Sequence, residues 1–312
     1  MSKGRRSRGR GTASWQARPI APILELEELT KRFGTFTAVD SVSLEVASGE
    51  VVGLIGANGS GKTTTMRMLL GLIRPSSGRA RIGGREVGAV AAREGVGYLP
   101  DDPPLDDRWT IRQQLDWWED LRGPAPRREE LETALSVETE KKIGDLSRGN
   151  RQKAAITMAL MHDPRLVVMD EPATGLDPLV RHDLWDALRG AVDRGAAVFV
   201  SSHVLGDIET VSDRVVVLHH GQAIYDGSVA DLARTSRRTV TIDFAGAVDP
   251  AAFAALDGVE VVVVEGSQVV LSVAGSLDRI VKAAARFEVV DFTSSGASLE
   301  GGFVDLSTSV GS

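Results

Sequence analysis

The stretch VVGLIGANGSGKTTT, residues 51–65, decides the fold of this chain. Its first five residues, 51–55, form an apolar run of strand length, and residues 56–63 fit the pattern G-x-x-x-x-G-K-[ST]. A helical pattern then continues to Leu70. A glycine-rich turn that joins a buried strand to the start of a helix is the setting in which backbone N–H groups bind phosphate. The stretch therefore predicts an α/β fold with a phosphate-binding loop.

The residue types in this turn suit the phosphates of a nucleotide. Glycines let backbone N–H groups converge on phosphate oxygens, and the helix start adds partial positive charge. Lys62 is expected to bridge the β and γ phosphates, while Thr63 ligates Mg²⁺. The alternative is a glycine-rich turn without a ligand, against which the strand, the helix and the lysine argue together. The predicted nucleotide-binding residues of the loop are Gly56, Asn58, Gly59, Ser60, Gly61, Lys62, Thr63 and Thr64.

A second apolar run ends in two carboxylates, Asp170 and Glu171. Because the ends of parallel strands meet at one edge of a sheet, these acids are expected beside the phosphate loop. Asp170 can hold Mg²⁺ through water, and Glu171 can polarise the water that attacks the γ-phosphate. Solvated acids at a strand end are the structural alternative. The loop alone occurs in small G proteins, nucleotide kinases and motor ATPases, so the class of enzyme depends on other residues.

Hydrophobic patterns predict how the first part of the chain is organised. From residue 23 to about 218, short β-branched runs alternate with helical stretches, which predicts a mainly parallel sheet covered by helices. Within it, residues 103–161 show helical signals, including a capping box of Thr110 and Gln113. Trp117 and Trp118 on that helix are interpreted as core, with a partner contact as the alternative. The parallel strands are expected at residues 51–55, 166–170, 196–200 and 214–218.

The sequence changes character beyond about residue 235. Strand-like and helical segments follow one another there in an order compatible with a split βαβ sandwich. This predicts a small C-terminal α+β domain over residues 237–312, in which we find no catalytic constellation. The strand-like segments are 239–244, 259–264, 268–273 and 288–292, and the helical one is 276–286.

Composition bounds the class of protein. A chain of 312 residues with 42% hydrophobic residues can fill the cores of one α/β domain and a smaller one. No apolar run approaches the about 20 residues needed to cross a bilayer, and no secretion signal follows the basic N-terminus, so we expect a cytoplasmic protein. The absence of cysteine excludes disulfides and thiolate chemistry. A net charge of -7 argues against nucleic-acid binding by the body of the protein.

The first residues, 1–22, are rich in arginine, glycine and serine. Such a composition cannot bury a core, so a disordered basic tail is expected. Contact of its charges, among them Lys3 and Arg5, with anionic lipid or RNA is the alternative.

Five stretches together resemble the ATP-binding subunits of ABC transporters, in that family's order. The resemblance covers about residues 23–234. It implies a P-loop NTPase fold of ABC type with an ATP-binding domain at 23–236, a helical subdomain at about 103–161, and ATP and Mg²⁺ as cofactors. The stretches are the phosphate loop, Leu146-Ser147-Arg148-Gly149-Asn150, Asp170-Glu171-Pro172, Gly175-Leu176-Asp177-Pro178 and Ser201-Ser202-His203.

The resemblance also implies roles and partners. Phe33 is similar to the aromatic residue on which adenine stacks, although a lone Phe equally suits a core. Ser147 as a helix N-cap would bind, with Gly149, the γ-phosphate held by a second subunit, so that a head-to-tail homodimer encloses two ATP molecules. Asp177 is assigned to the same nucleotide site, and His203 to the γ-phosphate and the attacking water. The other partner is a separate integral membrane permease, which places the subunit on the inner face of the cell membrane.

The chain departs from the family pattern at three positions. Arg148 and Asn150 stand where the family has the first glycine and the glutamine of Leu-Ser-Gly-Gly-Gln. Arg148 either adds charge near ATP or is solvated. Asp101 stands where the family has a glutamine that ligates Mg²⁺ and senses the membrane partner. A carboxylate still suits Mg²⁺, so Asp101 is retained as a metal ligand.

A narrower resemblance concerns the direction of transport. The acid at position 101, the pair Pro103-Pro104, and Ser298-Leu299-Glu300 followed by Phe303 are similar to the type-2 bacterial exporters. Gly301-Gly302 departs from that class, which has Glu-Val or Glu-Asp before the Phe. We therefore expect an exporter ATPase.

Two rival functions stay open. A soluble ABC ATPase of translation or DNA repair usually carries two such domains or a long coiled-coil insertion, and this sequence has neither. The second rival is an ATP-gated dimer clamp whose turnover is weakened by Asp101 and Arg148. His219 and His220, before Gly221, are interpreted as turn residues rather than metal ligands.

Overall fold

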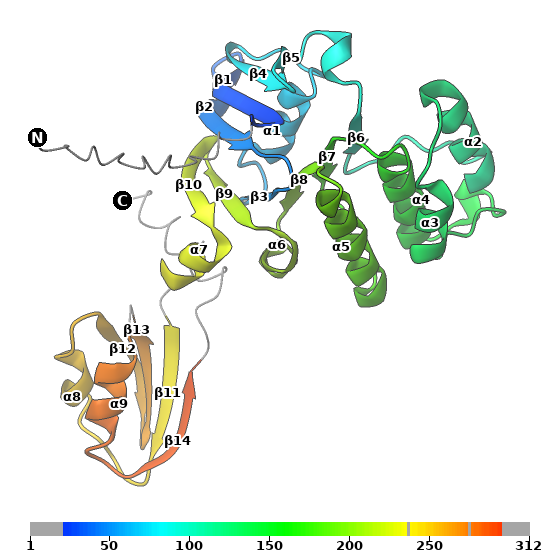
Figure 1. The fold of residues 1–312 in the computed structure, drawn as a ribbon. Coiled ribbons are helices and arrows are strands. Elements are labelled where there is room, and N and C mark those ends of the chain that lie inside the picture. The colour runs from blue at the N-terminus through cyan, green and yellow to red at the C-terminus, as the bar shows by residue number, and fades with distance from the viewer. Residues whose placement is uncertain (1–20, 236–237, 274–275, 295–312) are drawn as a thin grey trace, which may run out of the picture.

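The computed structural model describes residues 21–235, 238–273 and 276–294. Figure 1 shows three β-sheets in these residues. The first sheet, in the order β2-β1-β4-β5, consists of β1 (Leu24–Phe33), β2 (Phe36–Val46), β4 (Ser77–Ile82) and β5 (Arg85–Glu86). The second, in the order β10-β9-β3-β8-β7-β6, consists of β3 (Val51–Ile55), β6 (Val96–Leu99), β7 (Leu166–Asp170), β8 (Ala197–Ser202), β9 (Arg214–His219) and β10 (Gln222–Ser228). The third, in the order β12-β13-β11-β14, consists of β11 (Arg238–Phe244), β12 (Val259–Glu265), β13 (Gln268–Val273) and β14 (Val289–Ser294).

The second sheet is the predicted parallel core. Strands β6, β7, β8, β3 and β9 pair in parallel, and only β10 is antiparallel. The four predicted strands are confirmed, with changes at two of them: β9 ends one residue later, at His219, and β8 is shifted. Strand β8 begins at Ala197 and extends to Ser202, because Ser201 and Ser202 still pair with Leu54 and Ile55 of β3. The backbone N–H of Ala196 instead donates to the carbonyl of Ala191 and closes the preceding helix.

The first sheet was not predicted. The sequence indicated one mainly parallel sheet from residue 23 onward, and β1 and β2 instead form an antiparallel hairpin in a separate sheet. β1 and β2 are joined by Gly34 and Thr35 alone. A two-residue connection permits only antiparallel pairing, since a parallel crossover needs a dozen or more residues. Gly34 has a φ of 60°, which glycine adopts without strain. The hairpin therefore stands apart from the parallel sheet.

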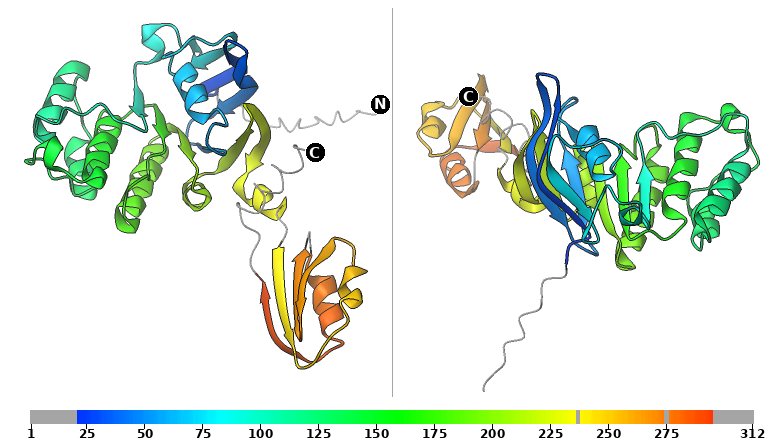
Figure 2. Two further views of the ribbon diagram at one scale, coloured as in Figure 1. Left: turned by 180° about the vertical axis from the view of Figure 1, so that it is seen from behind. Right: turned by 90° about the horizontal axis from the view of Figure 1, so that it is seen from above.

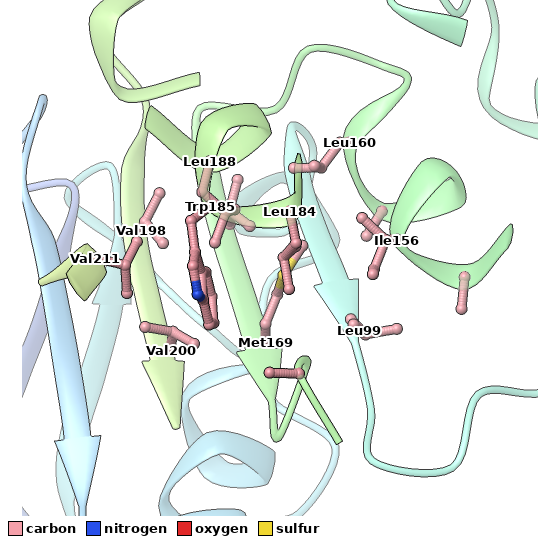
Figure 3. Packing of buried hydrophobic residues seen from close by; sticks show 14 of the residues in the cluster. Leu99, Ile156, Leu160, Met169, Leu184, Trp185, Leu188, Val198, Val200 and Val211 are labelled. Carbon is pink, nitrogen blue, oxygen red and sulfur yellow. The ribbon is translucent and has the colours of Figure 1, made fainter. Parts of the chain in front are cut away.

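Helix α5 (Pro178–Asp193) covers one face of the parallel sheet. In Figure 3 its residues Leu184, Trp185 and Leu188 lie over the strands that carry Met169 and Val198. All five side chains are at most 5% exposed. Burial of apolar area stabilises the folded state by about 25 cal/mol per Å². The packing of α5 on β7 and β8 therefore helps to hold these two strands in place. The residues at the ends of these two strands gain a rigid support.

The region 103–161 is helical, as predicted. Its capping box is confirmed, since the N–H of Gln113 donates to Oγ1 of Thr110 and the N–H of Thr110 donates to Oε1 of Gln113. Trp118 packs against the main core, whereas Trp117 is 44% exposed, so the core interpretation holds for one of the two. The helices of this region are α2 (Ile111–Arg122), α3 (Arg128–Ala134) and α4 (Arg148–Leu160); α1 (Lys62–Leu69), α6 (Leu205–Val211) and α7 (Val229–Thr235) lie outside it.

The third sheet is antiparallel and has a core of its own. Figure 2 shows α8 (Ala251–Ala254) and α9 (Asp278–Ala284) on one side of it. Val240, Leu271, Phe253 and Ile280 are buried together between the sheet and these helices. The strand order and the β-α-β-β-α-β sequence of elements match the predicted split βαβ sandwich. The exact boundaries of the two domains stay a prediction.

Two predictions fall outside the described residues. The basic tail was placed at residues 1–22, of which 1–20 are not described. The exporter-like C-terminal motif, Ser298 to Glu300 with Phe303, follows the last described residue, Ser294.

Candidate nucleotide-binding and hydrolysis site

The phosphate loop leaves β3 and enters α1 in the predicted way. Gly61 is the residue before the first turn of α1, with a φ of 108°. A Cβ on Gly61 would lie 2.6 Å from the carbonyl oxygen of Ala38, and one on Gly56 would lie 2.5 Å from that of Leu218. Contacts this short exclude a side chain at either position. The loop conformation thus depends on its glycines for space as well as for dihedral angles.

Lys62 points back over the loop that precedes it. Its Nζ donates a 2.8 Å hydrogen bond to the carbonyl of Gly56, and the residue is only 7% exposed. The carboxylate of Glu171 lies 3.9 Å from the same Nζ. A nearly buried ammonium group at the start of a helix holds positive charge where a phosphate would sit.

Asp170 is buried at the end of β7. Its residue is 1% exposed, and its Oδ1 accepts a 2.5 Å hydrogen bond from the hydroxyl of Ser201. Its Oδ2 is buried without a hydrogen-bond partner in the described part of the chain. Burial, and after it the charge of Asp170, raises the pKa of the neighbouring Tyr98 hydroxyl. A free carboxylate oxygen in this position fits a water ligand of Mg²⁺.

Glu171 and His203 contact each other across the ends of β7 and β8. Oε2 of Glu171 lies 2.6 Å from Nδ1 of His203 and accepts a 3.3 Å hydrogen bond from its backbone N–H. Glu171 has a φ of 52°, which is uncommon for a residue with a side chain. Its backbone N–H donates to Oγ of Ser201 at 3.2 Å. The two residues predicted to act on the attacking water are therefore brought together.

A cavity of about 340 Å³ opens in front of the loop. Phe33 lies at its wall and is 53% exposed, which excludes the core alternative for this residue. Phe36, its partner in the β1–β2 hairpin, also lines the cavity and is 62% exposed. The prediction missed Phe36, although two aromatic residues flanking a Gly34 turn were visible in the sequence. The other lining residues are Ala38, Asn58, Gly59, Ser60, Gly61, Lys62, Thr63, Thr64, Asp101 and Glu171.

Six predicted site residues are not among those that line this cavity. Gly56 and His203 contact the lining residues Lys62 and Glu171, and Asp170 directly precedes Glu171 in the chain. The other three, Ser147, Gly149 and Asp177, belong to two helix starts. Ser147 is the N-cap of α4, as predicted, and its hydroxyl accepts a 3.3 Å hydrogen bond from the N–H of Asn150. Gly149 lies one residue before Asn150 in the same turn. Oδ1 of Asp177 caps α5 by accepting from the N–H groups of Leu179 and Val180, both at 3.0 Å. The capping explains Asp177 structurally, and its nucleotide contact stays a prediction.

His220 lies in the β9–β10 turn with a φ of 46°, as predicted, whereas His219 is the last residue of β9 and pairs with Gln222. No group of three or more His, Cys, Asp or Glu side chains suited to a metal occurs in the described residues. Within the same residues, every helix is too short or too polar to cross a bilayer.

A phosphate loop between strand and helix, with an Asp-Glu pair at the end of a nearby parallel strand, defines a P-loop NTPase. The sequence profile of the ABC transporter family matches residues 39–174. The Nod factor export ATP-binding protein I of Rhizobium sp. (strain N33) is 38% identical over 66% of this chain and 70% of its own length. The protein of that name in Burkholderia orbicola (strain AU 1054) is 35% identical over 75% of this chain and 79% of its own. The chain belongs to the ABC transporter family, as an ATP-binding subunit with ATPase activity.

Solved structures agree with this assignment. The ATP-binding subunit of an ABC transporter is 30% identical, with a TM-score of 0.64 over 68% of this chain and 92% of that one. A dimeric bacterial ABC transporter cassette, 21% identical, has a TM-score of 0.61 over 66% of this chain and 98% of that one. At that identity the second likeness concerns the fold alone.

Proposed function

We propose that two copies of this subunit bind two ATP molecules head to tail and use their hydrolysis to drive a separate integral membrane permease in export. The subunit then lies on the cytoplasmic face of the membrane. The relatives named above are described as export proteins, which supports the direction. The division into an ATP-binding domain, 23–236, and a C-terminal domain, 237–312, is part of the proposal, and the separate core of the third sheet supports it.

One half of the proposed site comes from the subunit that holds the nucleotide. Lys62 contacts the β and γ phosphates and Thr63 ligates Mg²⁺, with Asp170 and Asp101 reaching the metal directly or through water. The free Oδ2 of Asp170 and the position of Asp101 in the cavity wall support these assignments. When bound, Mg²⁺ neutralises the charge that develops on the phosphate oxygens. Adenine stacks on Phe33.

Glu171 acts as the general base in this proposal. Its carboxylate accepts the proton of the attacking water, and His203 holds that carboxylate in place through Nδ1. Because Nδ1 faces Glu171, Nε2 is the ring nitrogen left to reach the γ-phosphate. The two side chains thus act on the water and on the phosphate from one position.

The position of the α4 start carries the proposal of a dimer. Ser147 is exposed, and neither it nor Gly149 is among the residues that line the nucleotide cavity. A helix start with unpaired N–H groups is a second phosphate-binding element. Two such elements in separate places on one chain suit a composite site in which each copy completes the other. Asp177, in the loop that packs beside Gly149, is proposed to take part from the same side.

The composite site links ATP to movement. ATP that contacts both copies stabilises the closed dimer in proportion to its affinity for that state. Hydrolysis removes the γ-phosphate that both copies share, and the dimer opens. A permease attached to both copies converts this cycle into transport.

Mixed dimers test the composite site. Lys62→Ala and Ser147→Ala each inactivate both sites of a homodimer. Consider a mixed dimer in which one copy carries Lys62→Ala and the other Ser147→Ala. If Ser147 acts on its partner's ATP, both changes fall in the same site, and the second site has an intact Lys62 and an intact Ser147. Phosphate release should therefore return on mixing, with roughly a quarter of all sites intact after random pairing. If mixing restores nothing, although both variants fold and dimerise with parental subunits, the composite site is wrong.

The membrane partner needs a separate test. Co-purification with one multi-span membrane protein, followed by ATP-dependent transport in inverted vesicles, is expected of an exporter subunit. Recovery with ribosomes or DNA instead would favour the soluble rival. Magnesium-dependent phosphate release by the subunit distinguishes an ATPase cycle from a clamp with little turnover.

A further inference from the structure

Two residues at which the sequence departs from its family, Asp101 and Arg148, line a single cavity. It has a volume of about 680 Å³ and is walled by the loop 101–107 and the first turns of α4. Asp101 also lines the nucleotide cavity. One carboxylate therefore faces both spaces, and Arg148 is the basic residue at the start of the opposite wall.

Among the described residues, Asp101 and Arg148 have no ion-pair partner, whereas Arg151 and Arg181 each have one. Both Asp101 and Arg148 are exposed. Two unpaired opposite charges on facing walls attract one another, and the low cost of a rotamer change lets them meet.

The same two walls already exchange one ion pair. Nη2 of Arg151 lies 2.9 Å from Oδ1 of Asp107. Arg148 precedes Arg151 by three residues in α4, so both side chains project from the same side of the helix. The stem of Arg148 is confined on its other side, since a Cβ added to Gly175 would lie 3.2 Å from its Cδ. Arg148 nevertheless remains one of the residues that line the cavity.

We propose that Arg148 is a positioning residue that pairs with Asp101 across this cavity when the subunit is free of nucleotide, and that Mg²⁺ with ATP withdraws Asp101 from the pair. The inference rests on the proposed role of Asp101 at the metal. The glutamine and glycine of the family pattern cannot form such a pair. Arg148 therefore competes with Mg²⁺ for one carboxylate, and its removal should strengthen the binding of Mg²⁺ with ATP.

Cross-linking tests whether positions 101 and 148 come within reach of each other across the cavity. The chain has no cysteine, so Asp101→Cys combined with Arg148→Cys introduces the only two thiols. A short bismaleimide should link them within the nucleotide-free subunit. Asp107→Cys combined with Arg151→Cys is the matched control, since that contact is already formed. Linkage of the control pair without linkage of the test pair overturns the proposal.

The magnesium requirement tests the competition. Arg148→Gln should lower the Mg²⁺ concentration needed for half-maximal ATP binding by about two- to fivefold, which corresponds to the energy of an exposed ion pair. Arg148→Lys keeps the charge and should show the parental Mg²⁺ requirement. ATP binding in EDTA should be unchanged, and Arg148→Gln should have no effect when Asp101→Asn is present. If Asp101→Asn alone leaves the Mg²⁺ requirement unchanged, the metal role of Asp101 is wrong. If Asp101→Asn does change the Mg²⁺ requirement, and Arg148→Gln has the same effect with and without Asp101→Asn, only the proposed pairing is wrong.

Discussion

The hydroxyl of Ser201 donates a 2.5 Å hydrogen bond to Oδ1 of Asp170 and accepts a 3.2 Å bond from the backbone N–H of Glu171. One side chain at the end of β8 thus fixes both acidic residues at the end of β7. The bond leaves Oδ2 of Asp170 buried and without a hydrogen-bond partner among the described residues. The orientation of the proposed metal ligand and that of the proposed base consequently depend on the same hydroxyl.

Replacement of that hydroxyl should cost stability as well as activity. Ser201→Ala leaves a buried carboxylate oxygen and a backbone N–H without partners, which costs about 1–3 kcal/mol. Urea unfolding in the absence of nucleotide measures this loss. The exposed Thr133→Ala, on α3, should change the free energy of unfolding by less than about 0.5 kcal/mol. Equal stability of Ser201→Ala and the parent would show that the bond contributes nothing.

Glu171→Gln should separate ATP binding from hydrolysis. The amide keeps the shape of the side chain but is a much weaker base, so phosphate release should fall by about 10²–10⁴-fold. ATP affinity should stay within a few fold of the parent, because the lost group is not a phosphate ligand. Glu140→Gln, an exposed acid paired with Arg112, is the control and should turn over normally. Hydrolysis at the parental rate by Glu171→Gln would exclude this residue as the base.

Two loop glycines should respond differently to alanine. A Cβ at Gly61 would meet the carbonyl of Ala38 at 2.6 Å, whereas a Cβ at Gly59 meets nothing within 4 Å. Both have positive φ, so Gly59→Ala carries a conformational cost of about 1–2 kcal/mol and Gly61→Ala a steric cost in addition. Thermal unfolding without nucleotide should show the lower midpoint for Gly61→Ala. A lower midpoint for Gly59→Ala than for Gly61→Ala would mean that Gly61 does not lie close to the carbonyl of Ala38.

Phe33 and Phe36 of the β1–β2 hairpin should determine how strongly the adenine ring contributes to ATP binding. Stacking of a base on an aromatic ring is worth about 1–3 kcal/mol, so Phe33→Ala should weaken ATP binding by about 5- to 150-fold. Binding of inorganic tripolyphosphate, which has no base, should be unaffected. Phe36→Ala is the matched variant, since Phe36 is also an exposed aromatic residue at the same cavity. A loss confined to Phe36→Ala would transfer the stacking role to that residue.

The elements that sequence patterns predicted well are those set by neighbours along the chain. The loop at Gly56, the N-cap at Ser147 and the capping box at Thr110 depend on residues within a few positions of each other. Continuous apolar runs predict strands that are buried on both faces, as in β3 and β7. Even the small C-terminal sheet followed from the order of its segments. Such features depend on backbone dihedral preference and on local periodicity, which each stretch of sequence carries by itself.

Contacts between distant positions were decided only by tertiary structure. Ser201 and Asp170 are separated by 31 positions, and no periodicity relates them. The position of Asp101 in the walls of two cavities, and the exposure of Phe33 beside Phe36, depend on how loops from different strands pack. Local patterns determined that this chain has a phosphate loop, an Asp-Glu pair at the end of a strand and a helix start capped by Ser147. Packing decided which of them meet, because the free energy of a contact depends on geometry that no single stretch contains.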